Sequence, residues 1–373
     1  MRLRAFPALA ETHVPRALGA IFSLFILLAV TACDKKSSTP DWDTPGGKTP
    51  ATAKAASVET SITARDAPPP ATPENLQDIE PSEAEPSQEA TTGTAEGVST
   101  VGLRFIAYNV ENWLTMDRYV DRKNLKGAPK PDNEKKAVVK ILTRHAPDVI
   151  GLCEIGEATD LAEIQEVLKA AGLDLPHSHY TGGADPTRHL GLLSRFPITS
   201  TAKPEVSEYQ LAGQTFAINR GILDASVSAR GKSYRFLGVH LKSKRDSEQG
   251  DQEAIRLSEA RLLRRHVDSI LKTDADARLV VYGDFNDTRS TPAIKMITGN
   301  YNDPTYLTAI PAKDSRQEAW TQHWALNDIY SRIDFIMVSR GIRPDVNFGA
   351  ARIIDDAEWD EASDHRAVMA IFK

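Results

Sequence analysis

From residue 101 onward, short apolar runs alternate with longer segments in which apolar residues recur every three or four positions. The short runs are rich in Val, Ile, Leu and Phe and predict buried strands. They lie at residues 103–110, 148–155, 189–198, 279–282, 331–339 and 366–372. The amphipathic segments predict helices, because one face of each is apolar. These helices are expected at residues 135–145, 159–171 and 253–271.

Two further runs, residues 214–228 and 233–241, predict antiparallel strands joined by a turn at Arg230-Gly231. The chain therefore mixes hairpins with crossover helices, which predicts mixed or largely antiparallel sheets with helices on the outside. Residues 300–322 are polar and irregular, and we consider them a candidate substrate loop. No exposed apolar hairpin is evident, and residues 213–223 are only a weak candidate for one.

The first 33 residues have the pattern of an export signal. Three arginines precede an uncharged apolar run at residues 17–32, which is short for a membrane-spanning helix and typical of a secretory signal. The sequence Val30-Thr31-Ala32-Cys33 resembles the lipobox of bacterial lipoproteins. Residues 1–32 are therefore interpreted as a signal peptide and Cys33 as the lipidated first residue of an exported protein. An uncleaved anchor or a signal without lipidation is the alternative.

Residues 33–100 are dense in Pro, Ala, Thr, Ser and Glu, and Trp42 is their only aromatic residue. Such a segment buries too little apolar surface to fold, so it predicts a disordered tether between a membrane and the domain at residues 101–373. The membrane side is expected to be periplasmic or extracellular. If Cys33 carries lipid, Cys153 has no partner for an intramolecular disulfide, and its apolar surroundings predict a buried, inert thiol.

The net charge is concentrated outside the domain. The whole chain carries −6; residues 1–33 contribute +2 and residues 34–100 contribute −7, which leaves about −1 for residues 101–373. A nearly neutral domain has no overall basic field that would favour a nucleic-acid partner. The local cluster of Lys242, Lys244 and Arg245 can still attract phosphate groups. We expect the domain to be a monomer.

Eight polar residues lie at the ends of, or inside, apolar strand-like runs. Each alone has a structural explanation, such as a cap or an ion pair, but eight together are hard to explain by coincidence. Carboxylates and amides suit a hard cation such as Mg²⁺ or Mn²⁺, and the sequence contains no CxxC, HExxH, Walker-type or GxSxG motif. The set favours attack of water on a phosphate ester. The eight residues are Asn109, Glu154, His240, Asp284, Asn286, Asp334, Asp364 and His365.

Six motifs carry these residues along the chain. They are YNVEN at Asn109, a strand ending at Glu154, GVHLKSK at His240, GDFN at Asp284 and Asn286, RIDFIMVS at Asp334, and SDH at Asp364 and His365. In this order, over residues 103–373, the chain resembles the endonuclease/exonuclease/phosphatase superfamily, the group of deoxyribonuclease I, exonuclease III and the inositol polyphosphate 5-phosphatases.

Two positions differ from the residues that are common in the family. They are Cys153 and Trp113, and neither is a proposed ligand. The resemblance implies a four-layer α/β/β/α sandwich of two mixed, largely antiparallel sheets with outer helices.

The resemblance also implies roles. Glu154 is expected to be the principal ligand of Mg²⁺ or Mn²⁺, with Asn109 beside it and Asp364 approaching the ion. Asp284 is expected to orient or deprotonate the attacking water, and Asn286 to hold the phosphate or the water. His240 is expected to donate to phosphoryl oxygens, while His365, oriented by Asp334, is the second acid/base group; whether Asp284 or His365 takes the proton stays open. Arg188 and Lys242 are candidates for substrate phosphate contacts, with an exposed solvated cation as the equal alternative.

The leading functional interpretation is a membrane-tethered nuclease that acts on DNA or RNA, because YNVEN, HLKSK and GDFND are similar to motifs of secreted bacterial nuclease-like members of the superfamily. The alternative keeps the site and changes the substrate: a phosphatase or a phospholipid phosphodiesterase, of the inositol phosphate or sphingomyelinase kind. A third interpretation, a scaffold that only binds a partner, is disfavoured because every catalytic position is retained.

Overall fold

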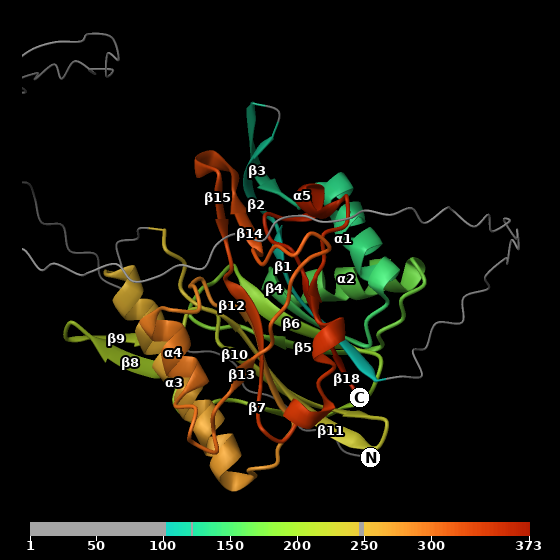
Figure 1. Cartoon of the computed structure of the whole chain (residues 1–373). Helices are drawn as coiled ribbons and strands as arrows, with labels where there is room; N and C mark the ends of the chain where they lie inside the picture. Colours follow the sequence, from blue (N-terminus) through green and yellow to red (C-terminus); the bar gives the residue numbers. More distant parts are fainter. Residues whose placement is uncertain (1–101, 121, 246–249) are drawn as a thin grey trace, which may run out of the picture. The chain divides into compact units, whose positions relative to one another are not determined.

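Two six-stranded sheets form the centre of the domain (Figure 1). The computed structural model describes residues 102–120, 122–245 and 250–373. The expected signal peptide, Cys33 and the tether lie outside these residues, so they stay predictions. Within the described ranges, no helix is long and apolar enough to cross a membrane.

In the first sheet, β1 and β4 run parallel and the other neighbours run antiparallel. Its strands, in spatial order, are β17 (Arg352–Ile353), β18 (Val368–Phe372), β1 (Leu103–Trp113), β4 (Val149–Ile155), β6 (His189–Ser194) and β5 (His177–Thr181). The second sheet has the same plan, with β11 and β12 as its parallel pair. Its strands are β13 (Thr308–Ala309), β16 (Asp334–Val338), β12 (Leu279–Asp284), β11 (Lys232–His240), β10 (Ile222–Ala229) and β7 (Ile198–Ala202).

Three apolar clusters separate the layers. One lies between the two sheets and includes Phe105 of β1 and Phe236 of β11. A second packs α1 and α2 on the outer face of the first sheet, and a third packs α3 and α4 on the outer face of the second. The expected four-layer α/β/β/α sandwich is therefore confirmed. The helices are α1 (Asp132–His145), α2 (Ala158–Ala170), α3 (Gln252–Thr273), α4 (Pro292–Thr298) and the short α5 (Trp359–Ala362), and the 3₁₀ turns are η1 (Ala325–Asn327), η2 (Arg343–Asp345) and η3 (Phe348–Ala350).

The two sheets approach each other closely around the ring of Tyr282. A Cβ added to Gly151 of β4 would lie 1.9 Å from this ring, and one added to Gly238 of β11 would lie 2.6 Å from its hydroxyl. Phe105 packs edge-on against the same ring, with centroids 4.9 Å apart. Glycine at residues 151 and 238 is thus what allows a tyrosine to fill the centre of the sandwich.

Three two-stranded hairpins complete the domain: β2 (Met116–Val120) with β3 (Lys123–Ala128), β8 (Glu208–Leu211) with β9 (Gln214–Ala217), and β14 (Gln322–Trp324) with β15 (Ile329–Ser331). Figure 1 draws β2–β3 and β14–β15 projecting from the same end of the domain. The single strand expected over residues 214–228 was wrong. Gly221, with φ +76°, turns the chain and separates β9 from β10.

The expectation that no apolar hairpin is exposed was also wrong. The β14–β15 hairpin exposes Trp324 and Ile329 by 45% each, Tyr330 by 50% and Leu326 by 85%. These residues are dispersed among polar neighbours over only ten positions, so they produce no periodic signal in the sequence. Cys153, by contrast, is a free, buried thiol as expected, and burial raises its pKa well above the usual value.

Candidate active site

Three neighbouring strands of the second sheet place acidic and imidazole side chains at the same edge. His240 at the end of β11 is paired in register with Asp284 at the end of β12, and Asp284 is paired with Asp334 at the start of β16. The first sheet reaches this point through Asn109 of β1, whose Nδ2 donates to Asp284 Oδ2 at 3.1 Å. The polar ends of both sheets therefore meet at Asp284.

Asp284 is buried, with 2% of its surface exposed, and its Oδ2 faces two imidazoles. His240 Nε2 lies 3.4 Å and His365 Nε2 lies 3.7 Å from that oxygen. Burial raises the pKa of Asp284 to about 7, and the charges of Asp334 and Glu154 add to the rise. A carboxylate whose pKa lies near neutrality is suited to exchange a proton with water at neutral pH.

Asn286 positions Asp284 through the turn that follows β12. Its backbone N–H donates to Asp284 Oδ1 at 2.8 Å, and its side-chain Nδ2 donates to the Leu241 carbonyl at 2.9 Å. Asn286 itself has a φ of +50°, a left-handed conformation that asparagine tolerates better than most residues. The residue expected to hold phosphate or water thus also fixes the carboxylate beside it through its backbone N–H.

His365 is held by a second buried carboxylate. Its Nδ1 lies 2.8 Å from Asp334 Oδ2. Burial alone would lower the pKa of His365, but the carboxylates of Asp334, Asp284 and Asp364 outweigh burial and raise this pKa well above its usual value. His240 has the opposite environment, because burial and the positive charge of Arg220 lower its pKa well below the usual value. The raised pKa of His365 therefore favours its charged form, and the lowered pKa of His240 favours its neutral form.

Glu154 adopts strained backbone geometry at the end of β4. Its φ is +64°, which is uncommon for a residue with a Cβ and is frequent at functional sites. The carboxylate accepts hydrogen bonds from Asn109 Nδ2 at 3.2 Å and from the Asn112 backbone N–H at 3.0 Å. Arg188 Nε lies 3.9 Å from Glu154 Oε2. The strain and these contacts hold the carboxylate at the sheet edge.

Three carboxylates, Glu111, Glu154 and Asp364, crowd together beside Asp284. Glu111 Oε2 accepts a hydrogen bond from the Asp364 backbone N–H at 3.0 Å. Burial and the charge of Asp364 raise the pKa of Glu111 to about 7, while burial and the charge of Glu154 raise the pKa of Asp364. Carboxylates that repel one another in this way form a donor set that fits a hard divalent cation.

Asn109 is oriented differently from a metal ligand in this structure. Its Oδ1 accepts from the Glu111 backbone N–H at 3.0 Å, so its NH₂ group faces Glu154 and Asp284. Another possible ligand set, Asp284, Asp334 and His365, has its atoms within 4.8 Å of one another. The short His365–Asp334 hydrogen bond engages this set, and such a pair suits proton transfer.

The predicted substrate cations, Arg188 and Lys242, both lie at this edge. Arg188 precedes β6 and donates from Nε to Asn112 Oδ1 at 2.9 Å. Lys242 is buried two residues beyond His240, with 8% of its surface exposed. Neither side chain is the freely solvated cation of the alternative interpretation. A third cation, Arg220, has a buried side chain and affects the pKa of both His240 and Lys242.

Sequence reasoning missed Glu111, Asn112 and Arg220. Glu111 and Asn112 lie inside the YNVEN motif, and both have positive φ angles, +45° and +56°. A polar pair separated from Asn109 only by Val110 was the signal that could have identified them. Arg220 had no such signal, because residues 214–228 resemble one continuous strand.

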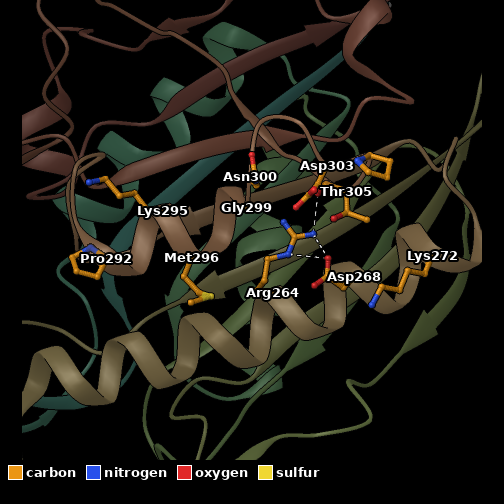
Figure 2. Close-up of a pocket in the computed structure, with 11 residues that line it drawn as sticks. Arg264, Asp268, Lys272, Pro292, Lys295, Met296, Gly299, Asn300, Asp303 and Thr305 are labelled. Carbon is orange, nitrogen blue, oxygen red and sulfur yellow. Dashed lines mark hydrogen bonds and ion pairs between the residues drawn. The ribbon is translucent and has the colours of Figure 1, made fainter.

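A cavity lies elsewhere, between α3 and α4 (Figure 2). It has a volume of about 710 Å³ and is lined in part by Asn300, Asp303 and Thr305 of the candidate substrate loop. Its central side chain, Arg264, donates to Asp268 Oδ1 at 2.6 Å and to the Thr305 carbonyl at 2.9 Å. The bond to Thr305 ties the loop to α3, which gives the arginine a structural role. None of the predicted site residues lines this cavity.

A family model named the endonuclease/exonuclease/phosphatase family matches residues 123–365. No curated protein matches the chain. Among solved structures, the endonuclease/exonuclease/phosphatase from Bacteroides vulgatus is similar, with 19% identity and a TM-score of 0.52 over 74% of this chain and 99% of that one. Sphingomyelinase C from Streptomyces griseocarneus has 16% identity and a TM-score of 0.51 over 74% and 100% of the two chains. A Staphylococcus aureus beta toxin mutant with bound magnesium ions has 15% identity and a TM-score of 0.50 over 73% of this chain and 100% of that one.

The fold and the site together define a phosphoester hydrolase. The chain belongs to the endonuclease/exonuclease/phosphatase family.

Proposed function

We propose that the protein is a metal-dependent nuclease that hydrolyses phosphodiesters of DNA or RNA. The observation that carries the choice of nucleic acid is the positive charge on both flanks of the site. On one flank, the β2–β3 hairpin has four basic and two acidic residues between residues 116 and 128, and Lys123 and Lys126 are exposed. On the other, Lys244 and Arg245 follow β11 and are exposed. Cations on two sides of a hydrolytic centre suit a polyanion that crosses it.

The β2–β3 hairpin is joined directly to the site. Arg118 of β2 donates from Nη2 to the Asn112 carbonyl at 2.6 Å, and Asn112 in turn donates to Glu154. Lys130, just after β3, donates from Nζ to the Glu111 carbonyl at 3.0 Å. A strand bound along the hairpin would therefore lead into the carboxylate cluster.

The chemistry follows from the convergence on Asp284. Asp284 accepts the proton of the attacking water, because its Oδ2 is the atom toward which Asn109, His240 and His365 all point. The water oxygen bonds to phosphorus as the bond from phosphorus to the leaving oxygen breaks. His365, held by Asp334, donates its proton to that leaving oxygen, and neutral His240 donates a hydrogen bond to a phosphoryl oxygen. Mg²⁺ or Mn²⁺ held by Glu154, Glu111 and Asp364 would supply Lewis-acid stabilisation of the charge on phosphorus oxygens.

The test is a substrate panel with the full-length protein. Plasmid DNA, a single-stranded RNA, an inositol phosphate and a choline phospholipid are incubated with Mg²⁺, and in parallel with EDTA. Cleavage of DNA or RNA that EDTA abolishes is the expected result. Turnover of the phospholipid or the inositol phosphate alone would overturn the choice of nucleic acid, and turnover of none of the four would favour a binding scaffold.

The second candidate function is a phospholipid phosphodiesterase, and the β14–β15 hairpin favours it. This hairpin exposes Leu326 at its tip, and the His323 backbone N–H at its base donates to the Asp364 carbonyl at 2.9 Å. An apolar tip beside the site could enter a lipid surface. Leu326→Asp separates the two candidates, because it should impair hydrolysis of vesicle lipid and leave cleavage of a soluble oligonucleotide within about twofold.

We also propose that the chain is an exported lipoprotein whose lipidated Cys33 holds a monomeric domain at a membrane. The support is the lipobox-like sequence and the composition of residues 33–100. Cys33→Ser should move the protein from the membrane to the soluble fraction of the producing cells. Retention of the Ser variant in the membrane would contradict lipidation at this residue.

A further inference from the structure

Strand β1 contains a bulge beside the carboxylate cluster. Its residues 110–112 lie opposite the single residue Glu154 of β4, between two stretches where the strands pair in register. Two residues of this bulge, Glu111 and Asn112, have left-handed backbone conformations, with φ of +45° and +56°. Residues with a Cβ adopt this conformation at a cost, so the surrounding contacts must hold the bulge in place.

The backbone groups of a bulge lose their partners in the sheet and need other ones. On one side, the Asn112 N–H donates to Glu154 Oε2 at 3.0 Å. The carbonyls on the other side accept from two cations that lie outside the sheet. Lys130 Nζ donates to the Glu111 carbonyl at 3.0 Å, and Arg118 Nη2 donates to the Asn112 carbonyl at 2.6 Å.

One peptide group connects Lys130 to Glu154. The carbonyl that accepts from Lys130 and the N–H that donates to Glu154 belong to the same peptide, the one between Glu111 and Asn112. A trans peptide is planar, and its C=O and N–H point in opposite directions. The ammonium and the carboxylate therefore hold this peptide from its two sides, and each hydrogen bond polarises the group in favour of the other.

Lys130 is buried, which is rare for a lysine unless it is paired. Its side chain is 0% exposed, and its Nζ also forms an ion pair with Glu134 Oε2 at 2.9 Å. Pro129 and Pro131 flank the lysine, and a residue before a proline is restricted to extended conformations. A stiff segment between β3 and α1 thus carries the ammonium to the bulge.

Arg118 ties the base of the β2–β3 hairpin to the same bulge. Its Nη2 donates to the Leu114 carbonyl at 2.9 Å as well, and its Nε donates to the Ala128 carbonyl at 3.3 Å. Because Arg118 belongs to β2 and Ala128 ends β3, the guanidinium joins both strands of the hairpin to the end of β1.

The charge of Lys130 also acts on the carboxylate cluster. Burial and the charge of Asp364 raise the pKa of Glu111, and the charge of Lys130 opposes this rise. Groups behind the ligands of a metal orient those ligands, and the loss of one typically costs about 10- to 100-fold in metal affinity.

We propose that Lys130 and Arg118 are positioning residues, which hold the peptide between Glu111 and Asn112 and thereby orient Glu154 toward the divalent cation. This rests on the cation of the proposed function and adds the groups that hold its site in place. The hairpin then has two roles: its exposed lysines face the nucleic acid, and its base supports the cation site.

The test measures Mg²⁺ binding to the full-length protein by titration calorimetry. Lys130→Met removes the charge and the donor and keeps most of the length of the side chain. Its dissociation constant for Mg²⁺ should rise about tenfold or more, and Lys130→Arg should recover part of this loss. Lys136→Met is the matched control, because Lys136 is exposed on α1, and it should bind Mg²⁺ as the wild type does.

A kinetic measurement separates positioning of the cation site from other roles. Saturating Mg²⁺ should restore the kcat of Lys130→Met for bis(p-nitrophenyl) phosphate to within about threefold of wild type. A kcat that stays low would place Lys130 in the chemical step and overturn the positioning role. Wild-type affinity for Mg²⁺ in a folded Lys130→Met variant would also overturn the proposal.

A second variant covers the case in which Lys130→Met does not fold. Arg118→Gln then replaces it, with the same expected loss of Mg²⁺ affinity and partial recovery in Arg118→Lys. The titration needs no substrate, so a wild type that hydrolyses no phosphodiester would overturn the proposed function, while Mg²⁺ binding still decides the role of Lys130. A wild type that binds neither Mg²⁺ nor Mn²⁺ would overturn both.

Discussion

His365 Nδ1 lies 2.8 Å from Asp334 Oδ2, and both side chains are buried. Asp334 begins β16, and His365 lies 31 residues later, just before β18 of the other sheet. The pair therefore connects the two sheets at the edge where Asp284 ends β12. A buried carboxylate on one ring nitrogen fixes the orientation and tautomer of the imidazole and leaves the other nitrogen facing the site.

Replacing Asp334 with Asn should test this orientation directly. Asn keeps the shape of the side chain and removes the charge that favours protonated His365, so kcat for bis(p-nitrophenyl) phosphate should fall about 10²- to 10⁴-fold. KM should change little, since Asp334 does not face the substrate side. Asp345→Asn is the control, because Asp345 pairs with Lys232 and Arg278 away from the site. A kcat within threefold of wild type would show that the pair is structural.

Asp284 should reveal a conflict between activity and stability. Its pKa in the folded protein is about 7, above the ordinary 3.8, so folding favours the protonated form. The contribution of this pKa shift to the free energy of unfolding is fully present below pH 3.8 and is lost as the pH rises to about 7. Asp284→Asn should therefore raise Tm in EDTA by at least about 3 °C at pH 8 and much less at pH 4.5, while abolishing turnover. A lower Tm at pH 8 would contradict the cost of burying the charged form of this carboxylate.

The carboxylate cluster predicts that a divalent cation stabilises the protein. Mg²⁺ that neutralises Glu111, Glu154 and Asp364 binds the folded state only, so Tm should rise with Mg²⁺ concentration. At 100 times the dissociation constant, the stabilisation is about 2.7 kcal/mol. Glu154→Gln should remove most of the shift, and Glu166→Gln, at a surface position of α2, should keep it. The same Mg²⁺ response in Glu154→Gln and wild type would show that the cation binds elsewhere.

The close packing of the two sheets predicts that substitution of Gly151 lowers the stability of the protein. Gly151→Ala would place a methyl group in the ring of Tyr282, so the two sheets must separate, at a cost of about 1–3 kcal/mol. Gly349→Ala is the control, because the nearest atom to an added Cβ is 3.8 Å away. Urea unfolding of both variants measures the difference. Equal stabilities would contradict the close packing of β4 against β12.

Much of the site could be predicted because its residues interrupt apolar strands. Glu154, His240 and Asp284 each end a buried run, and a polar group in such a place needs a partner or a function. Sheet register then brings together residues that are far apart in sequence, and the hydrophobic pattern correctly indicated the central strands β1, β4, β6, β11, β12, β16 and β18.

The remainder depends on tertiary contacts that leave no local pattern. Arg220 is defined by the loop contacts of Gly183 and by Glu259 on a distant helix, and neither is visible in residues 214–228 alone. The exposed hairpin around Leu326 spans only ten residues, too few for a periodic signal. Glu111 follows the apolar Val110 as a strand residue would, yet it has a φ of +45°.

The central claim is that Asp284 and His365, 81 positions apart in the chain, act as one unit on a phosphodiester. The direct test measures kcat of the full-length protein with Mg²⁺ for Asp284→Ala, His365→Ala and the double variant, with folding checked by circular dichroism. Each single variant should lose at least about 10²-fold, and the double variant should be slower than the slower single one by no more than about threefold. Losses that multiply, or a folded single variant with nearly wild-type turnover, would contradict the account.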